Sequence, residues 1–423
     1  MVVSIARPMK VENQSIKLIK PSNPTPPTLS RYKLGFIDEF LFAVDVGVVL
    51  SFSANNPNLV ARLEKSLEET LTRFYPLAGR YVEEIQTIDC SDQGASFIHV
   101  NANIKLEELL FSEVNKYIDD LFPSKVEVGD SLLAIQVTTF ECGGVALAIS
   151  GLHKILDAST LCIFINEWAA ISREENSEIE FTGHGFNSSL LFPARGLTSL
   201  PVQPVTDGML SKYTRKKLVF TQTVISNMKA KGNKSTRRWS KVQLVSAIIW
   251  RALMKANLTD PERESALIQP VNLRGRMGSL IPKDSCGNVL GLCVTKCKTL
   301  ETTEVLVDRL TDSIKTTISN FARAHHDSEE GQAIVLNSLS NMTNLPSSTH
   351  VVIISSWCRF PFHEIDFGFG KPIWVAPWTT PRNHVTVLMD DAEGNGVEAY
   401  VCVHEKYVPY FEEALELVNA FVV

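Results

Sequence analysis

The sequence predicts a mixed α/β protein, α+β in arrangement, whose two halves each contain a sizeable sheet. Apolar runs typical of strands alternate with apolar stripes at helical spacing along most of the 423 residues. The pattern fails between the halves, where Gly, Pro, Ser and Thr dominate. We therefore expect an N-terminal domain at 1–190, a linker at 191–213 and a C-terminal domain at 214–423. The hydrophobic share of 44% and the charged share of 21% suffice for two large cores.

In the first half, strands are expected at 15–20, 46–52, 97–100, 132–137 and 145–149. The run at 15–20 alternates polar and apolar residues, which predicts an edge strand. The last two strands are joined by a hairpin turn at 141–144, which contains two glycines. Two helices are expected as well. One carries four leucines at four-residue spacing between 59 and 71, and the other spans 161–168.

In the second half, strands are expected at 217–220, 269–273, 351–355, 386–389 and 396–403. Helices are expected at 242–254, at 310–321, and at the end of the chain around Phe411, Leu415 and Val418. Ser240 and Gln243 form an S-x-x-Q capping box, which predicts where the first of these helices begins.

His153 follows the strand-like run at 145–149 and precedes a helix-like stripe. Rigid elements on both sides would hold its imidazole in place at the mouth of a cleft. An unperturbed histidine has a pKa of about 6.5, so it accepts a proton near neutral pH. Asp157 stands at the start of the helix. The H-x-x-x-D pair therefore indicates either general-base chemistry or a partly buried histidine beside a helix N-cap.

Other chemistries have less support. The sequence contains no G-x-S-x-G motif, no P-loop and no G-x-G-x-x-G after a strand. Its eight cysteines include no C-x-x-C pair and complete no zinc site, so we expect free thiols and no metal. The net charge of −6 argues against a nucleic-acid partner. No apolar run reaches the roughly 18 residues of a membrane helix, and the run at 2–6 is too short for a signal peptide. We expect a cytoplasmic protein without a membrane partner.

A basic stretch extends from Lys229 to Lys241, includes Arg238 and contains no acidic residue. It leads into the capped helix that begins after Ser240. A helix N-terminus beside clustered cations is typical of a phosphate site. A solvated basic loop is the other interpretation of the same pattern.

Two motifs, one in each half, resemble the signatures of the plant BAHD acyltransferases. His153-Lys154-Ile155-Leu156-Asp157 resembles their HxxxD motif. The stretch 366–372, Asp-Phe-Gly-Phe-Gly-Lys-Pro, resembles their DFGWG motif with the basic residue and proline that follow it. Shorter matches lie at 75–80, 271–274, 287–288 and 356–359, so the resemblance covers nearly the whole chain. Features at 24–26, 140–144 and 355–359 are most similar to the alkaloid-acetylating branch.

This resemblance implies two chloramphenicol-acetyltransferase-like domains with a channel between them, and a crossover segment at about 368–388 that joins the first domain. It implies an acyl-CoA-dependent O-acyltransferase, a cytoplasmic monomer without a permanently bound cofactor. Acetyl-CoA is the expected co-substrate, and a small-molecule alcohol of alkaloid type is the expected acceptor. His153 would act as the general base, without an acyl-enzyme intermediate.

The family also implies roles for other residues. Asp157 and Asp366 would be structural, with Asp157 paired to Arg274. Asn288 would give structural support, and Arg359 would do so through a salt bridge, with contact to the substrate as the alternative. The residues expected near coenzyme A are Arg238, Ser240, Lys241, Gly368 and Phe369.

Two departures from the family pattern affect these expectations. Phe369 replaces the usual Trp, so an indole N–H that can stabilise an oxyanion is missing. Residues 285–289 read SCGNV where anthocyanin acyltransferases carry YFGNC, which disfavours a flavonoid glucoside acceptor. The alternatives are an enzyme using another donor, malonyl or aromatic, or another alcohol, or a relative whose transferase activity is altered or lost through Phe369.

Overall fold

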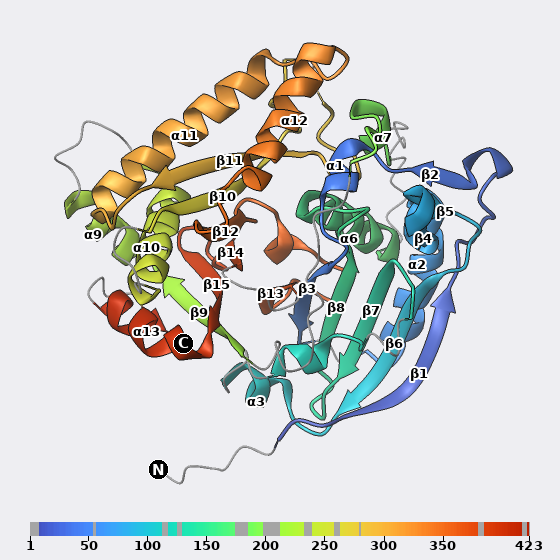
Figure 1. The fold of residues 1–423 in the computed structure, drawn as a ribbon. Helices are drawn as coiled ribbons and strands as arrows, with labels where there is room; N and C mark the ends of the chain where they lie inside the picture. Colours follow the sequence, from blue (N-terminus) through green and yellow to red (C-terminus); the bar gives the residue numbers. More distant parts are fainter. Residues whose placement is uncertain are drawn as a thin grey trace, which may run out of the picture. The chain divides into compact units, whose positions relative to one another are not determined.

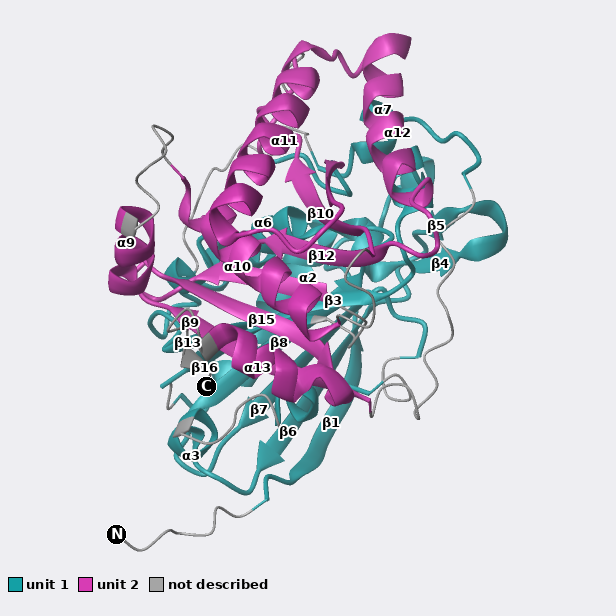
Figure 2. Ribbon diagram, turned by 60° about the vertical axis from the view of Figure 1, so that its left-hand side comes forward, with its two compact units in different colours: residues 1–201, 284–289, 360–380 teal, residues 202–283, 290–359, 381–423 magenta. Residues whose placement is uncertain are grey.

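In the computed structural model, the chain folds into two compact units (Figure 2). Unit 1 consists of residues 1–201, 284–289 and 360–380, and unit 2 of residues 202–283, 290–359 and 381–423. The structure describes residues 8–53, 56–111, 117–124, 129–173, 185–197, 212–231, 239–257, 263–278, 281–379, 385–416 and 421–422.

A six-stranded mixed sheet forms the centre of unit 1, in the order β1-β6-β7-β8-β3-β13. The strands are β1 (Val11–Ile19), β6 (Ala95–Ala102), β7 (Leu133–Thr139), β8 (Val145–Leu152), β3 (Asp45–Phe52) and β13 (Trp374–Thr379). β6 and β7 are parallel, and every other neighbouring pair is antiparallel. Figure 1 shows β1, β6, β7 and β8 side by side in this order. The predicted edge strand is therefore confirmed as β1, and the predicted hairpin as β7–β8.

Helices α2 (Leu59–Arg73) and α6 (Ala158–Ser172) pack against each other in unit 1. The four leucines predicted to form one stripe of α2 are all buried. The Trp168 indole of α6 donates a hydrogen bond to the Ser66 hydroxyl of α2 at 3.0 Å, which satisfies its N–H inside the core. Burying a leucine side chain contributes about 1.5–3 kcal/mol, so this stripe fixes α2 on α6.

Smaller elements complete unit 1. A three-stranded antiparallel sheet has the order β2 (Arg31–Lys33), β5 (Thr87–Asp89), β4 (Arg80–Val82). The described residues of this unit also form three short α-helices, α1 (Phe36–Phe40), α3 (Leu106–Phe111) and α7 (Ser188–Leu191). All five residues of α1 are buried, including the carboxylate residues Asp38 and Glu39.

A seven-stranded mixed sheet forms the centre of unit 2, in the order β11-β10-β12-β14-β15-β9-β16. The strands are β11 (Leu290–Cys297), β10 (Ser265–Asn272), β12 (His350–Ser356), β14 (Val385–Asp390), β15 (Val397–His404), β9 (Tyr213–Phe220) and β16 (Phe421–Val422). β12 is parallel to both β10 and β14, and the remaining pairs are antiparallel.

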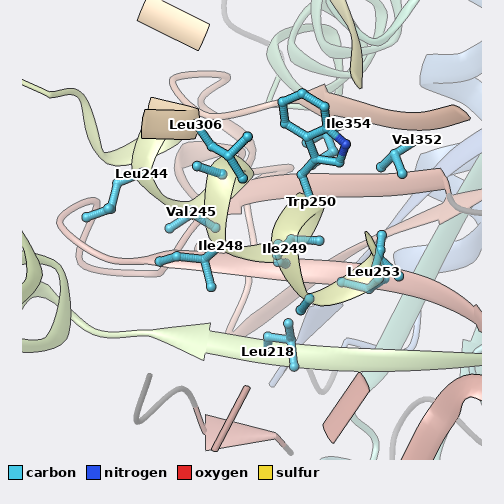
Figure 3. Packing of buried hydrophobic residues seen from close by; sticks show 14 of the residues in the cluster. Leu218, Leu244, Val245, Ile248, Ile249, Trp250, Leu253, Leu306, Val352 and Ile354 are labelled. Carbon is cyan, nitrogen blue, oxygen red and sulfur yellow. The ribbon is translucent and has the colours of Figure 1, made fainter. Parts of the chain in front are cut away.

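Helix α10 (Lys241–Ala256) is the centre of the unit 2 core. Figure 3 shows its apolar side chains, among them Ile248 and Trp250, packed with residues of the sheet and with Leu306. The Trp250 indole donates to the Ser265 hydroxyl of β10 at 2.9 Å. The predicted capping box is confirmed at Ser240 and Gln243. The other helices are α9 (Gln222–Lys231), α11 (Thr303–Arg323), α12 (Glu329–Thr343) and α13 (Val408–Glu416).

The prediction of a mixed α/β protein is confirmed, but several elements were not predicted. β13 contains Pro377, which lacks the N–H that a central strand needs, and it is tolerated because β13 is an edge strand of its sheet. The expected crossover at about 368–388 includes part of β14, which pairs with β12 and β15 in unit 2. In the structure the segments that join unit 1 are 360–380 and 284–289. The linker expected at 191–213 lies mostly outside the described residues.

Three other observations concern the cysteines, possible metal sites and possible membrane helices. The eight cysteines are free. Within the described part of the chain, no group of three or more His, Cys, Asp or Glu side chains is arranged to hold a metal ion. Among the same residues, none of the helices is long and apolar enough to span a bilayer.

Candidate active site

The loop between β8 and α6 carries His153 and is held at several points. The His153 amide donates to the carbonyl of Val44 at 2.7 Å. The Lys154 ammonium is fully buried and donates to the carbonyls of Asp38 and Glu39 at 3.1 and 2.9 Å. Ile155 and Leu156 are also fully buried. The backbone around His153 is therefore fixed by packing and by hydrogen bonds to α1.

The His153 side chain is half-buried, and Nδ1 lies 3.1 Å from the Asn288 amide oxygen. Burial lowers the pKa of His153 from its ordinary value, because it penalises the charged imidazolium. Backbone hydrogen bonds at His153 and Leu156, the nearby Asp157 carboxylate and the Asn288 side chain oppose this effect. His153 is therefore neutral near pH 7. Because the Asn288 amide oxygen only accepts, Nδ1 carries the hydrogen of the neutral ring, and Nε2 is the nitrogen that can accept a proton from a bound hydroxyl.

Asp157 has two roles in the local structure. One carboxylate oxygen caps α6 by accepting from the Thr160 amide at 2.8 Å. The other accepts from the Val289 amide at 3.1 Å. Asp157 thus fixes the start of α6 and also holds the segment that presents Asn288 to His153. Its expected pairing with Arg274 joins residues of different units and stays a prediction.

The segment 284–289 is bound to α6 at a second point, Thr160. The Thr160 hydroxyl donates to the carbonyl of Gly287 at 2.8 Å, and the Gly287 amide lies 3.1 Å from the same hydroxyl. Gly287 has a φ of +98°, and a Cβ there would lie 2.2 Å from the Ser188 hydroxyl. Only glycine fits this position, so the Gly-Asn pair that resembles the family motif has a physical basis in close approach.

Asp366 organises the second motif. One oxygen of its carboxylate accepts hydrogen bonds from the backbone amides of Gly368, Phe369 and Gly370, at 2.7, 3.1 and 2.9 Å. Gly368 and Gly370 have φ values of +91° and +96°, which side chains other than glycine rarely adopt. A Cβ on Gly368 would also lie 2.3 Å from the Arg62 guanidinium. These contacts account for the two glycines and give Asp366 a structural role.

Phe369 lies in an aromatic cluster on unit 1. Its ring contacts Phe52 edge to face at a centroid distance of 4.9 Å, and it stacks on Phe367 at 5.9 Å. Phe52 and Phe367 are fully buried, whereas Phe369 is half-buried. We interpret the position as one that serves packing, because an aromatic ring without an N–H donor can make these contacts.

Phe369→Trp tests this interpretation. We expect an earlier thermal transition and no gain in kcat, because overpacking a site fitted to Phe costs about 1–3 kcal/mol. Circular dichroism melts and steady-state kinetics measure the two quantities. Phe360→Trp, which adds an indole to another half-buried Phe of unit 1, is the control. A rise in kcat at unchanged stability would instead assign Phe369 to the reacting carbonyl.

The residues expected near coenzyme A phosphates are only partly described. Arg238 lies outside the described residues. Ser240 is the N-cap of α10. The Lys241 ammonium forms an ion pair with Asp390 at 2.7 Å and donates to the carbonyls of Gly394 and Gly396. Lys241 thus supports the turn between β14 and β15, and its contact with coenzyme A stays a prediction.

The two predicted supporting arginines lie in unit 2. Arg274 is buried, and its amide and guanidinium donate to the Asn272 side chain. Arg359 is exposed and has a φ of +74°, stabilised by a 2.6 Å hydrogen bond from its amide to Asp390. Burial and the charge of Arg359 lower the pKa of Arg276. The salt bridge expected for Arg359 stays a prediction.

Sequence reasoning missed the residues behind Asn288. Asp38 of α1 is fully buried and accepts from the Asn288 side-chain amide at 2.8 Å. Ser188 of α7 donates to the same carboxylate at 3.0 Å. A signal was present in the sequence, since Asp38 and Glu39 interrupt an otherwise apolar run at 36–42, where a buried carboxylate requires partners.

Comparison with known proteins gives a consistent result. The model of the Transferase family matches residues 9–418. A pelargonidin 3-O-(6-caffeoylglucoside) 5-O-(6-O-malonylglucoside) 4'''-malonyltransferase from Salvia splendens is 33% identical over 433 residues, covering 97% of this chain and 99% of the relative. A limonoid 21-O-acetyltransferase from Melia azedarach is 33% identical over 422 residues, covering 97% and 98%. The crystal structure of vinorine synthase superposes with a TM-score of 0.82 at 28% identity, covering 96% of this chain and 98% of that one.

Proposed function

This chain belongs to the Transferase family of BAHD acyltransferases, and we propose that it transfers an acetyl group from acetyl-CoA to a hydroxyl of an alkaloid- or limonoid-type small molecule. Family membership makes it an acyl-CoA-dependent acyltransferase. The donor, the acceptor and the residue roles are proposals. The observation that carries the role of His153 is that its imidazole is neutral and half-buried and that Asn288 holds its Nδ1.

In the proposed reaction, His153 is the general base. An alcohol attacks a thioester poorly while it keeps its proton. As the new C–O bond forms, the hydroxyl proton moves to Nε2 of His153. The tetrahedral intermediate then breaks its C–S bond, and His153 returns the proton to the departing coenzyme A thiolate. No acyl group passes to the protein, so donor and acceptor must be bound at the same time.

Other residues would bind coenzyme A or border the acyl donor in this scheme. Arg238, Ser240 and Lys241 would lie near the coenzyme A phosphates, supported by the basic composition of 229–241 and the capped start of α10. Gly368 and Phe369 would border the donor, on the turn held by Asp366.

Relatives of equal identity have different donors, so a malonyltransferase is the second candidate. Two observations favour acetyl transfer to an acceptor that is not a flavonoid glucoside. The motifs at 140–144 and 355–359 resemble the alkaloid-acetylating branch, and SCGNV at 285–289 departs from the YFGNC of anthocyanin acyltransferases. A relative that binds coenzyme A without turnover is the third candidate, and Phe369 is the residue that suggests it.

The assay that separates these candidates uses the purified protein with acetyl-CoA or malonyl-CoA and a panel of alkaloid, limonoid and pelargonidin-glucoside alcohols. We expect coenzyme A thiol release that requires the acceptor, and an acetylated product by mass spectrometry. Intact-protein mass after mixing with acetyl-CoA alone should show no acylated protein. Malonyl products alone would favour the second candidate. Coenzyme A binding by calorimetry without any transfer would favour the third.

A further inference from the structure

Asp38 is buried in α1, and its carboxylate accepts four hydrogen bonds, two on each oxygen. One carboxylate oxygen accepts from the Gly35 amide at 2.9 Å and the Ser188 hydroxyl at 3.0 Å. The other accepts from the backbone amide and side-chain amide of Asn288 at 3.2 and 2.8 Å. The ionised carboxylate can accept all four bonds, whereas a proton on Asp38 would have to be donated to Ser188, the one partner that can also accept.

These bonds determine which way the Asn288 amide faces. Its nitrogen lies 2.8 Å from the Asp38 carboxylate and 2.7 Å from the His153 carbonyl oxygen. Both are pure acceptors, so this atom must be the NH₂ group, and its two hydrogens are both used. The amide oxygen is therefore the atom 3.1 Å from Nδ1 of His153. An amide oxygen only accepts, so Nδ1 must carry a hydrogen.

We propose that Asp38 is a positioning residue that acts through Asn288: it holds the proton of neutral His153 on Nδ1 and so leaves Nε2 unprotonated. A neutral imidazole carries one hydrogen, and the partner of one nitrogen decides which nitrogen is free. Without an ionised Asp38, the Asn288 amide has no fixed orientation, so only the backbone hydrogen bonds at His153 and Leu156 still favour one tautomer, and the other tautomer gains population. The inference rests on the proposed role of His153 as base and extends it by naming the residue that prepares it.

The surroundings of Asp38 agree with this role. Burial raises its pKa to about 6, and its four hydrogen bonds oppose the shift, so it is ionised at neutral pH. The titratable groups around it are Tyr32 behind Ser188, the neighbouring Glu39, buried Lys154 and His153 beyond Asn288. Lys154 adjoins His153 in sequence and donates to the Asp38 carbonyl, so the backbone of the base and that of Asp38 are tied together.

Asp38→Asn tests the proposal. Its NH₂ group would face either Gly35 N–H or Asn288 N–H, so the network cannot be rebuilt. We expect kcat to fall by at least about 10-fold, because misplacing a catalytic group costs up to about 100-fold. The KM for acetyl-CoA should stay within about 2-fold, since the residues proposed to bind the donor do not include Asp38 or Asn288. Asn288→Ala should lower kcat similarly. The double variant should be no slower than Asn288→Ala alone, because both changes break one connection.

Glu39→Gln is the matched control. Glu39 is also a buried carboxylate of α1, but it accepts from the amides of Arg195, Gly196 and Leu197 instead of Asn288. The variant removes the same charge from the same helix, so we expect it to lower the melting temperature and leave kcat unchanged. An equal loss of kcat in Glu39→Gln and Asp38→Asn would overturn the proposal, because it would show that any damage to α1 slows turnover.

The tautomer of His153 can be measured by NMR spectroscopy, independently of catalytic activity. In ¹⁵N-histidine-labelled protein, the His153 signals are assigned by their loss in His153→Gln. We expect a protonated Nδ1 and an unprotonated Nε2 in the wild type and in Glu39→Gln, and both tautomers in Asp38→Asn. If Asp38→Asn does not fold, Asn288→Ala decides. An unchanged tautomer with near wild-type kcat in the folded variant overturns the inference. Absence of any transfer by the wild type would overturn the proposed function instead.

Discussion

Replacement of His153 by alanine is expected to lower kcat by at least about 100-fold, the usual scale for loss of a general base. Coenzyme A affinity, measured by calorimetry, should change little, because the imidazole is proposed to contact the acceptor hydroxyl and not the phosphates. In the wild type, kcat/KM should fall only as the pH drops below about 6.5. Burial lowers the pKa of His153 and keeps it neutral to lower pH, and Asp38, with a pKa of about 6, is protonated in the same range.

His99→Ala is the control for this experiment. His99 lies on β6 in the same unit, its pKa is also lowered by burial, and it bonds to Thr139 at 3.0 Å. We expect His99→Ala to keep the wild-type kcat and the same fall of kcat/KM at low pH as the wild type. Near wild-type turnover in His153→Ala, with the protein folded and loaded with both substrates, would remove His153 from the mechanism and favour a base elsewhere on the chain.

The placement of the histidine between a strand and a helix could be predicted because its causes are local. Strand β8 and helix α6 have sequence patterns of their own, and Asp157 is a typical N-cap. The capping box of α10 and the hairpin between β7 and β8 were predicted correctly for the same reason. In each case the deciding contacts lie within a few residues of one another along the chain.

The support behind the histidine could not be predicted, because its contacts join distant parts of the chain. Asn288 is 135 residues from His153 and 250 residues from Asp38. No periodicity links such positions, and the Gly-Asn pair drew notice only through its resemblance to the family. β13 was missed because Pro377 disfavours a strand unless the strand lies at a sheet edge, which depends on the tertiary structure.

Asp157 joins the local motif to this distant support, and two substitutions separate its roles. Asp157→Ala removes the cap of α6, which costs about 0.5–2 kcal/mol, and leaves the Val289 amide unpaired, which costs about 1–3 kcal/mol. We expect a clearly lower melting temperature together with a large loss of kcat. Ser328→Ala, which removes the N-cap of α12 in unit 2, is the control and should lower the melting temperature alone.

Asp157→Asn is the sharper variant. Its amide oxygen can still accept from Thr160, so the α6 cap remains, but its NH₂ group faces the Val289 amide, and the two donors repel. Displacing Val289 moves Asn288 away from His153, so kcat should fall by about 10-fold or more while much of the stability is kept. The negative charge of Asp157 raises the pKa of His153, so Asp157→Asn should lower that pKa. The fall of kcat/KM at low pH should then occur at a lower pH than in the wild type. If kcat and the pH dependence of kcat/KM both stay at wild-type values, Asp157 is a helix cap without influence on His153.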